Sequence, residues 1–348
     1  MKYTILQHPG HNRVYYNSAD KLAMAELKIA STHLSVSCNN IEITEIGNVR
    51  YLLFETDNVL SENDLQILSR LSFLFAIFRV DKLKDETCLV PIKKHNYQYL
   101  DSKISTLLKY HGKTNEIFTR MMINLALLSS DFDYSENIKI LDPVAGKGTT
   151  LFEAAVSNFD VYGIEIEPKA VHETTIFFKK YLEMERLKHI STKRQVYGTN
   201  KSNGVFIQEF EYARSKEEFK SQDSIKRLGI VNGNSKEADK YFKNEDFHLI
   251  VGDLPYGIVH GNTGAKKTGA IIRNPSELLS ECIPAWYKVL KKGGVIVMAW
   301  NSFLVSRQKL AGIFNEYGFE VLDQTAYNEF EHMVDKSIKR DIVVAKKV

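Results

Sequence analysis

IKILDPVAGKGTT, at residues 138–150, is an apolar run that breaks into an acid, a proline and a glycine-rich turn. A nucleotide P-loop requires a glycine, then four residues, then Gly-Lys followed by serine or threonine, so that backbone amides surround a phosphate. Leu141 stands at the first glycine position, and Gly148 stands where the hydroxyl residue must follow Lys147. The segment therefore does not predict a P-loop.

A dinucleotide fold is the second interpretation of this turn. Gly146 and Gly148 match the first two glycines of GxGxxG, Leu151 occupies the third position, and Glu165 follows where an acid binds ribose. NAD enzymes and methyltransferases that use S-adenosylmethionine share this order of strand, turn, helix, strand and acid. Asp142 favours the methyl donor, because a carboxylate at the strand tip repels a pyrophosphate but attracts an ammonium and a sulfonium.

The sequence around this turn alternates strand-like and helix-like segments. KTNEIFTRMMINLALLS predicts a helix with Thr114 as its N-cap, and strands and helices alternate from there to the end. This pattern predicts an α/β fold with a mostly parallel, doubly wound sheet and a C-terminal antiparallel strand, and ligands bind at the carboxyl ends of such strands. We expect a small N-terminal α+β domain at 1–100 with RNA binding as a candidate role, a linker at 101–112, and a catalytic domain at 113–348.

The motif DLPYG ends the fourth strand of the series and suits methyl transfer to an exocyclic amine. The lone pair of such an amine is delocalised into its base, so two acceptors must bind its N–H groups and direct the lone pair towards the methyl group. Asp253 and the carbonyl of Leu254, fixed by Pro255, are the candidate acceptors. Tyr256 offers a stacking face for the base, and Gly257 lets the chain turn away.

These motifs resemble a known family. DPVAGKGTT, GIEIEP and DLPYG, together with the helix before them, are similar to the Rossmann-like catalytic domain of RNA guanine-N2 methyltransferases, which are often fused to a THUMP domain. The resemblance covers residues 110–348, and the residues before it show no THUMP pattern. It implies S-adenosylmethionine as the methyl donor and tRNA as the expected RNA.

The resemblance also implies a donor site. Acids and small residues after the first strand would contact the methionine part, Glu165 the ribose hydroxyls, and Asn234 the adenine edge, although an aspartate is common at that last position. The implied donor-binding residues are Phe118, Thr119, Asp142, Ala145, Gly146, Gly148, Thr149, Glu165, Ile166, Asn234, Ser235 and Asp253.

A basic insertion at about 184–227 separates the second and third strands. Between Lys179 and Arg227 there are twelve Lys or Arg against seven Asp or Glu, with aromatic residues interleaved. Basic and aromatic side chains together suit RNA phosphates and bases, so we expect this segment to contact RNA along with Lys266 and Lys267. The alternative is a solvated helical hairpin whose aromatic residues face the core.

Other features narrow the class of protein. No stretch has the apolar length of a membrane span, and the N-terminus lacks the apolar core of a secretory signal, so we expect a cytoplasmic protein. The three cysteines are scattered, which predicts neither a disulfide framework nor a metal site. A homodimer and a small activating subunit both stay open.

The sequence thus predicts a methyltransferase acting on the N2 amine of guanosine in RNA. An adenine-N6 or cytosine-N4 methyltransferase is the first alternative, because its substrate amine is also exocyclic and has a delocalised lone pair. A non-catalytic module that binds the donor or RNA is the second, and a NAD oxidoreductase is the third.

Overall fold

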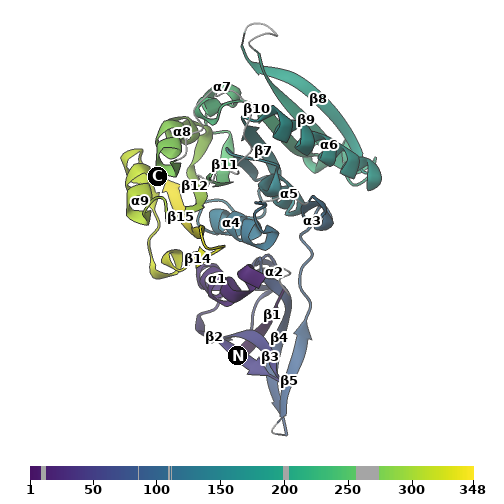
Figure 1. The fold of residues 1–348 in the computed structure, drawn as a ribbon. Helices are drawn as coiled ribbons and strands as arrows, with labels where there is room; N and C mark the ends of the chain where they lie inside the picture. The colour runs from purple at the N-terminus through teal and green to yellow at the C-terminus, as the bar shows by residue number, and fades with distance from the viewer. Residues whose placement is uncertain (9–12, 85, 109, 111, 199–203, 256–273) are drawn as a thin grey trace. The chain divides into compact units, whose positions relative to one another are not determined.

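The computed structural model describes residues 1–8, 13–84, 86–108, 110, 112–198, 204–255 and 274–348 (Figure 1). They divide into two compact units. The N-terminal unit comprises Met1–Tyr97 with Asp323–Lys339, and the C-terminal unit comprises Gln98–Leu322 with Arg340–Val348. We had expected 113–348 to form one domain, whereas one C-terminal segment belongs with the N-terminal unit.

The N-terminal unit is an antiparallel sheet in the order β2-β3-β1-β4-β5. Its strands are β1 (Lys2–Gln7), β2 (Cys38–Ile46), β3 (Val49–Thr56), β4 (Leu74–Leu83) and β5 (Glu86–Ile92). Its other elements are α1 (Arg13–Ser31), α2 (Glu62–Ser69), η4 (Thr325–Asn328) and β14 (His332–Met333). Helix α1 contacts η4 and β14, and the Lys28 ammonium pairs with Glu329 at 2.8 Å, so the late segment packs on this unit.

The C-terminal unit is built on a sheet in the order β13-β15-β12-β11-β6-β7-β10-β9-β8. The central strands are parallel, while antiparallel strands flank them on both sides. The predicted mostly parallel α/β sheet with a C-terminal antiparallel strand is therefore confirmed. The strands are β6 (Lys139–Asp142), β7 (Asp160–Glu165), β8 (Lys188–Tyr197), β9 (Val205–Ala213), β10 (Lys226–Asn232), β11 (Phe247–Asp253), β12 (Leu290–Asn301), β13 (Phe319–Val321) and β15 (Lys339–Lys347).

Among the helices of this unit, α5 contacts α3 and α4, and α8 contacts α7 and α9. The α-helices are α3 (Lys103–Leu107), α4 (Glu116–Leu128), α5 (Thr149–Val156), α6 (Pro168–Met184), α7 (Ala238–Tyr241), α8 (Pro275–Val289) and α9 (Arg307–Glu316). Short 3-10 helices are η1 (Glu218–Lys220), η2 (Gln222–Ser224) and η3 (Ser235–Glu237). No helix in the described ranges is long and apolar enough to cross a membrane.

The parallel strands are apolar because helices cover them. Their registers align the strand ends, since Asp142 lies level with Gly163, Glu165 with Asn232, and Asp253 with Ala299. The acidic ends of β6, β7 and β11 consequently meet at one edge of the sheet.

The basic insertion forms a β-hairpin, β8–β9, and this corrects the helical hairpin that we had weighed as the alternative. The hairpin extends the sheet beyond β10 in antiparallel fashion (Figure 1). Phe210 and Tyr212 on β9 pack against Phe178 of α6, with ring centroids 5.2 and 5.4 Å apart. These ring contacts pack β9 against α6.

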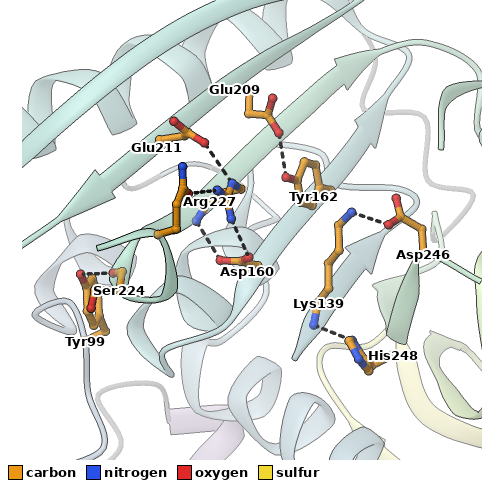
Figure 2. A network of polar contacts seen from close by, with 11 residues as sticks. Tyr99, Lys139, Asp160, Tyr162, Glu209, Glu211, Ser224, Arg227, Asp246 and His248 are labelled. Carbon is orange, nitrogen blue, oxygen red and sulfur yellow. Dashed lines mark hydrogen bonds and ion pairs between the residues drawn. The ribbon is translucent and has the colours of Figure 1, made fainter. Parts of the chain in front are cut away.

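Polar contacts fasten this hairpin to the parallel strands (Figure 2). The Tyr162 hydroxyl of β7 donates to Glu209 of β9 at 2.7 Å, although β10 lies between the two strands. Gly229 of β10 is level with both residues, and a Cβ there would lie 2.6 Å from the Tyr162 ring. Arg227 adds hydrogen bonds to Asp160 and to Glu211. A glycine therefore allows the tyrosine to cross a strand.

Candidate functional site

The acidic edge of the sheet borders a cavity of about 330 Å³, which we call the donor cavity. Its walls come from the segment before α4, α4 itself, the turn after β6, the end of β7, the start of α6 and the end of β11. All of these elements belong to the C-terminal unit. The cavity is the site at which the sequence predicts chemistry.

The glycine turn brings backbone to the wall of this cavity. Gly146 and Gly148 have φ values of +51° and +84°, a conformation that glycine adopts without strain. A Cβ on Gly146 would meet no protein atom within 4 Å, whereas one on Gly148 would lie 2.9 Å from Thr174 Cγ2. Gly148 thus serves packing, while Gly146 leaves room beside the cavity.

Asp142 is a buried acid at the tip of β6, with 3% of its surface exposed. Its Oδ1 accepts the Val144 N–H at 3.0 Å. Burial raises the pKa of Asp142 to about 7, the hydrogen bonds from Thr150 and Val144 oppose this, and the charges of Asp253 and Glu165 add to it. A cation in the cavity would compensate for this cost, because it stabilises the ionised carboxylate.

Glu165, at the end of β7, is held by two backbone amides. The N–H groups of Gly146 and Glu167 each donate to its carboxylate at 2.8 Å. Burial raises the pKa of Glu165, and these hydrogen bonds counteract it. Because a carboxylate has about four lone-pair positions, the side chain keeps the capacity to accept from two further hydroxyls.

Asp253, at the end of β11, is positioned by residues that are distant in sequence. The Thr114 hydroxyl donates to Asp253 Oδ2 at 2.7 Å. The Arg340 guanidinium lies 3.5 Å from the same oxygen, is itself buried, and covers the Phe118 ring at 4.8 Å. The next residue, Leu254, donates its N–H to the Ala299 carbonyl at 2.8 Å, which fixes the chain at the acid.

Most of the predicted residues line the donor cavity. They are Thr119, Asp142, Ala145, Gly146, Thr149, Glu165, Asp253, Leu254 and Pro255. Three other predicted residues do not line it: Phe118 is buried, Ile166 is 69% exposed, and Gly148 lies in the turn. Tyr256 and Gly257, as well as Lys266 and Lys267, lie outside the described residues.

Asn234 and Ser235 also lie outside the cavity wall. The Asn234 amide oxygen caps η3 by accepting the Lys236 N–H at 3.1 Å. The Ser235 hydroxyl accepts the Trp286 indole N–H at 3.0 Å. Both side chains thus have structural partners, and their contact with an adenine stays a prediction.

Several residues of the wall were not predicted as site residues. The sequence indicates Thr114 as the N-cap of α4, but the cap is Asn115, whose side chain accepts from Ile117 and Phe118. Tyr110 bonds the Thr149 hydroxyl at 2.9 Å. Met122 and Lys147 also line the cavity. Tyr110 lies in an irregular segment without periodicity, so sequence carried no signal for it.

Lys147, the lysine of the glycine turn after β6, has two partners. Its ammonium pairs with Glu173 at 2.8 Å and lies 5.1 Å from the centre of the Tyr110 ring. This residue also lies in the wall of the donor cavity.

The sheet has a glycine turn after its first parallel strand, an acid after the second and an acid-Leu-Pro sequence after the fourth. These features define a class I methyltransferase, whose methyl donor is S-adenosylmethionine. The chain belongs to the family described as RMKL-like methyltransferase domain, whose model matches residues 114–311. No curated protein matches the sequence.

Solved structures with a related chain path include TrmN from Thermus thermophilus, at 10% identity and a TM-score of 0.46, with 100% of this chain and 99% of that chain covered. A Streptococcus mutans protein in complex with SAH has 12% identity, a TM-score of 0.39, and coverage of 68% and 99%. An rRNA methylase from Streptococcus thermophilus has 13% identity, a TM-score of 0.36, and coverage of 68% and 98%. At such low values these likenesses carry no information on the substrate.

Proposed function

We propose that this protein methylates the exocyclic N2 amine of guanosine in RNA, and that the RNA is a tRNA. The observation that carries the proposal is the position of Asp253 in the wall of the donor cavity, beside Leu254 and Pro255. The resemblance of DPVAGKGTT, GIEIEP and DLPYG to RNA guanine-N2 methyltransferases supports the same assignment.

The residues of the cavity fit S-adenosylmethionine. This donor supplies a methyl group activated by a sulfonium. Asp142 would hold its cationic amino-acid end, because a buried carboxylate with a raised pKa gains most from a nearby positive charge. Glu165 would accept the ribose hydroxyls, and Ile166 would lie beside the adenine.

The acceptor groups would act on the amine of the base. Asp253 and the Leu254 carbonyl would bind its two N–H groups, which orients the nitrogen lone pair towards the donor cavity. Thr114 and Arg340 keep the Asp253 carboxylate in one orientation. When the nitrogen gains its carbon, it carries a surplus proton, and Asp253 is placed to receive it. Tyr256 would stack on the base.

The β8–β9 hairpin would supply part of the RNA-binding surface. Its first strand carries Lys188, Lys193 and Arg194 and no acid, and the hairpin is anchored through Tyr162 and Arg227. Phosphate contacts of this kind make affinity depend on salt. Neutralising several Lys and Arg of the hairpin should weaken RNA binding and flatten its salt dependence, and unchanged affinity would contradict this role.

The experiment that tests the function is incubation of total RNA with labelled donor, followed by nucleoside analysis. Wild-type protein should produce N2-methylguanosine, and Asp253→Ala should lose almost all label. Asp246→Ala is a matched control at the opposite end of β11, where Asp246 pairs with Lys139 at 2.7 Å, and it should retain activity. Label found only in methyladenosine or methylcytidine would refute the guanine assignment. Wild-type turnover by Asp253→Ala would remove that residue from the mechanism.

A further inference from the structure

A second cavity of about 300 Å³ lies in the C-terminal unit, and we call it the hairpin groove. Its walls come from the first turns of α6, from both strands of the β8–β9 hairpin and from the end of β10. None of the predicted catalytic or donor-binding residues lines it, whereas Lys193, Phe206 and Gln208 belong to the basic insertion. The groove is mixed in character, with an aromatic ring, a cation and several polar groups.

Two amide side chains of the groove donate their N–H groups to other protein groups. The Asn232 Nδ2 donates to the carbonyls of Glu165 and Ile166 at 3.0 and 3.2 Å. The Gln208 Nε2 donates to the Ser191 hydroxyl at 2.7 Å and to the Thr192 carbonyl at 2.9 Å. These bonds leave the amide oxygens as the groups that can serve a ligand, and an amide oxygen accepts hydrogen bonds.

Phe206 and Lys193 supply the other two elements of recognition. The Lys193 ammonium lies 5.2 Å from the centre of the Phe206 ring. Within the described ranges Lys193 has no carboxylate partner, unlike its neighbour Arg194, which pairs with Glu209 at 3.3 Å. The hydroxyl of Thr175, also in the wall, has no hydrogen-bond partner among the described residues.

The groove adjoins the donor cavity. Pro168 and Val171 of α6 line the groove, whereas Glu167 and Ala170, on the same two turns, line the donor cavity. Asn232 is level with Glu165 across the strand pair. A chain of nucleotides with one base at Asp253 could therefore continue over the start of α6.

We propose that the hairpin groove binds one nucleotide of the substrate RNA close to the methylated guanosine. The base stacks on Phe206 in place of the Lys193 ammonium, which moves to the phosphate. The oxygens of Asn232 and Gln208 accept from the N–H groups of the base edge. Aromatic stacking combined with a cation is the usual means by which proteins hold single-stranded RNA. The inference rests on the proposed function for its statement that the ligand is RNA.

The test measures binding of fluorescently labelled, unmodified tRNA transcript to the full chain by anisotropy. Stacking of one base predicts that Phe206→Leu binds ~5- to 150-fold more weakly, and Phe206→Tyr should bind like the wild type. Lys193→Ala should weaken binding, while Arg194→Ala, the same charge change one residue along β8, should weaken it clearly less. Calorimetric affinity for S-adenosylmethionine and the midpoint of thermal unfolding should stay at wild-type values in all four variants.

Three results would overturn the proposal. Equal losses in Lys193→Ala and Arg194→Ala would show diffuse attraction by the hairpin. Wild-type affinity in Phe206→Leu would show that no base stacks there. Weaker binding of S-adenosylmethionine in Phe206→Leu would assign the groove to the donor. Each leaves methylation of guanosine by the wild type intact, whereas a wild-type protein that binds no RNA would refute the proposed function as well.

Discussion

The substitution Thr114→Val tests how Asp253 is oriented. It removes the hydroxyl that donates to Asp253 Oδ2 at 2.7 Å and keeps the branched shape of the side chain. A hydrogen bond to a charged group contributes about 1.5–3 kcal/mol, which corresponds to a ~10- to 150-fold loss of rate. Because Arg340 remains 3.5 Å from the same oxygen, we expect the lower end, roughly tenfold.

Single-turnover methylation of the RNA that the wild type modifies is the assay, since it isolates the chemical step from product release. The rate should fall, while the dissociation constants for RNA and S-adenosylmethionine should remain unchanged. Thr114→Ser keeps the donor and is the matched control, with an expected rate close to wild type. A Thr114→Val protein with the wild-type rate, or one that is slow only because it binds the donor poorly, would refute the positioning role.

Two further predictions concern the donor and the fold. Burial gives Asp142 a pKa of about 7, so the acid is increasingly protonated below that pH, and calorimetric affinity for cationic S-adenosylmethionine should decrease with falling pH, by up to ~tenfold per unit. The Asp142→Asn variant should bind weakly without this dependence, and a parallel pH profile in both proteins would contradict the assignment. Gly229→Ala places a Cβ 2.6 Å from the Tyr162 ring that reaches Glu209, and should lower the free energy of unfolding by about 1–3 kcal/mol in urea titrations. Gly312→Ala is its control, because a Cβ there meets no atom within 4 Å and helix α9 tolerates alanine. Equal stability losses in both variants would show that the passage of the Tyr162 side chain over Gly229 does not contribute to stability.

The parallel core and the donor turn could be predicted because their signals are local. Strand, glycine turn, helix and acid follow one another in the sequence, and parallel topology brings the ends of the strands together. The acids Asp142, Glu165 and Asp253 were found in this way, and all three line one cavity.

The support of Asp253 could not be predicted, since it depends on contacts between distant parts of the chain. The sequence at Thr114 is typical of an N-cap, but in the structure the neighbouring Asn115 caps α4. Thr114 instead bonds Asp253, a contact that its local sequence does not indicate. Arg340 lies near the start of β15, and nothing in the sequence around it indicates a partner 87 residues earlier.

The hairpin was not predicted because β8 is a polar edge strand. Its sequence KHISTKRQVY has few apolar residues, and most of them are not buried. Periodicity identifies a strand only when one face enters a core, and no residue of β8 is fully buried, whereas Phe210 and Tyr212 of β9 pack against Phe178 of α6. Tertiary pairing with β10 therefore determined the structure.

The support of Asp253 also has a consequence for the order in which the enzyme is made. Thr114 precedes nearly the whole C-terminal unit, and Arg340 belongs to its last strand. A ribosome that has released residues up to the end of β11 has already produced the glycine turn, Asp142 and Glu165, but not the guanidinium that steadies the acceptor acid. A chain cut short before residue 340 would therefore lack the guanidinium beside Asp253, and it would also lack the buried strand that pairs with β12 and β13.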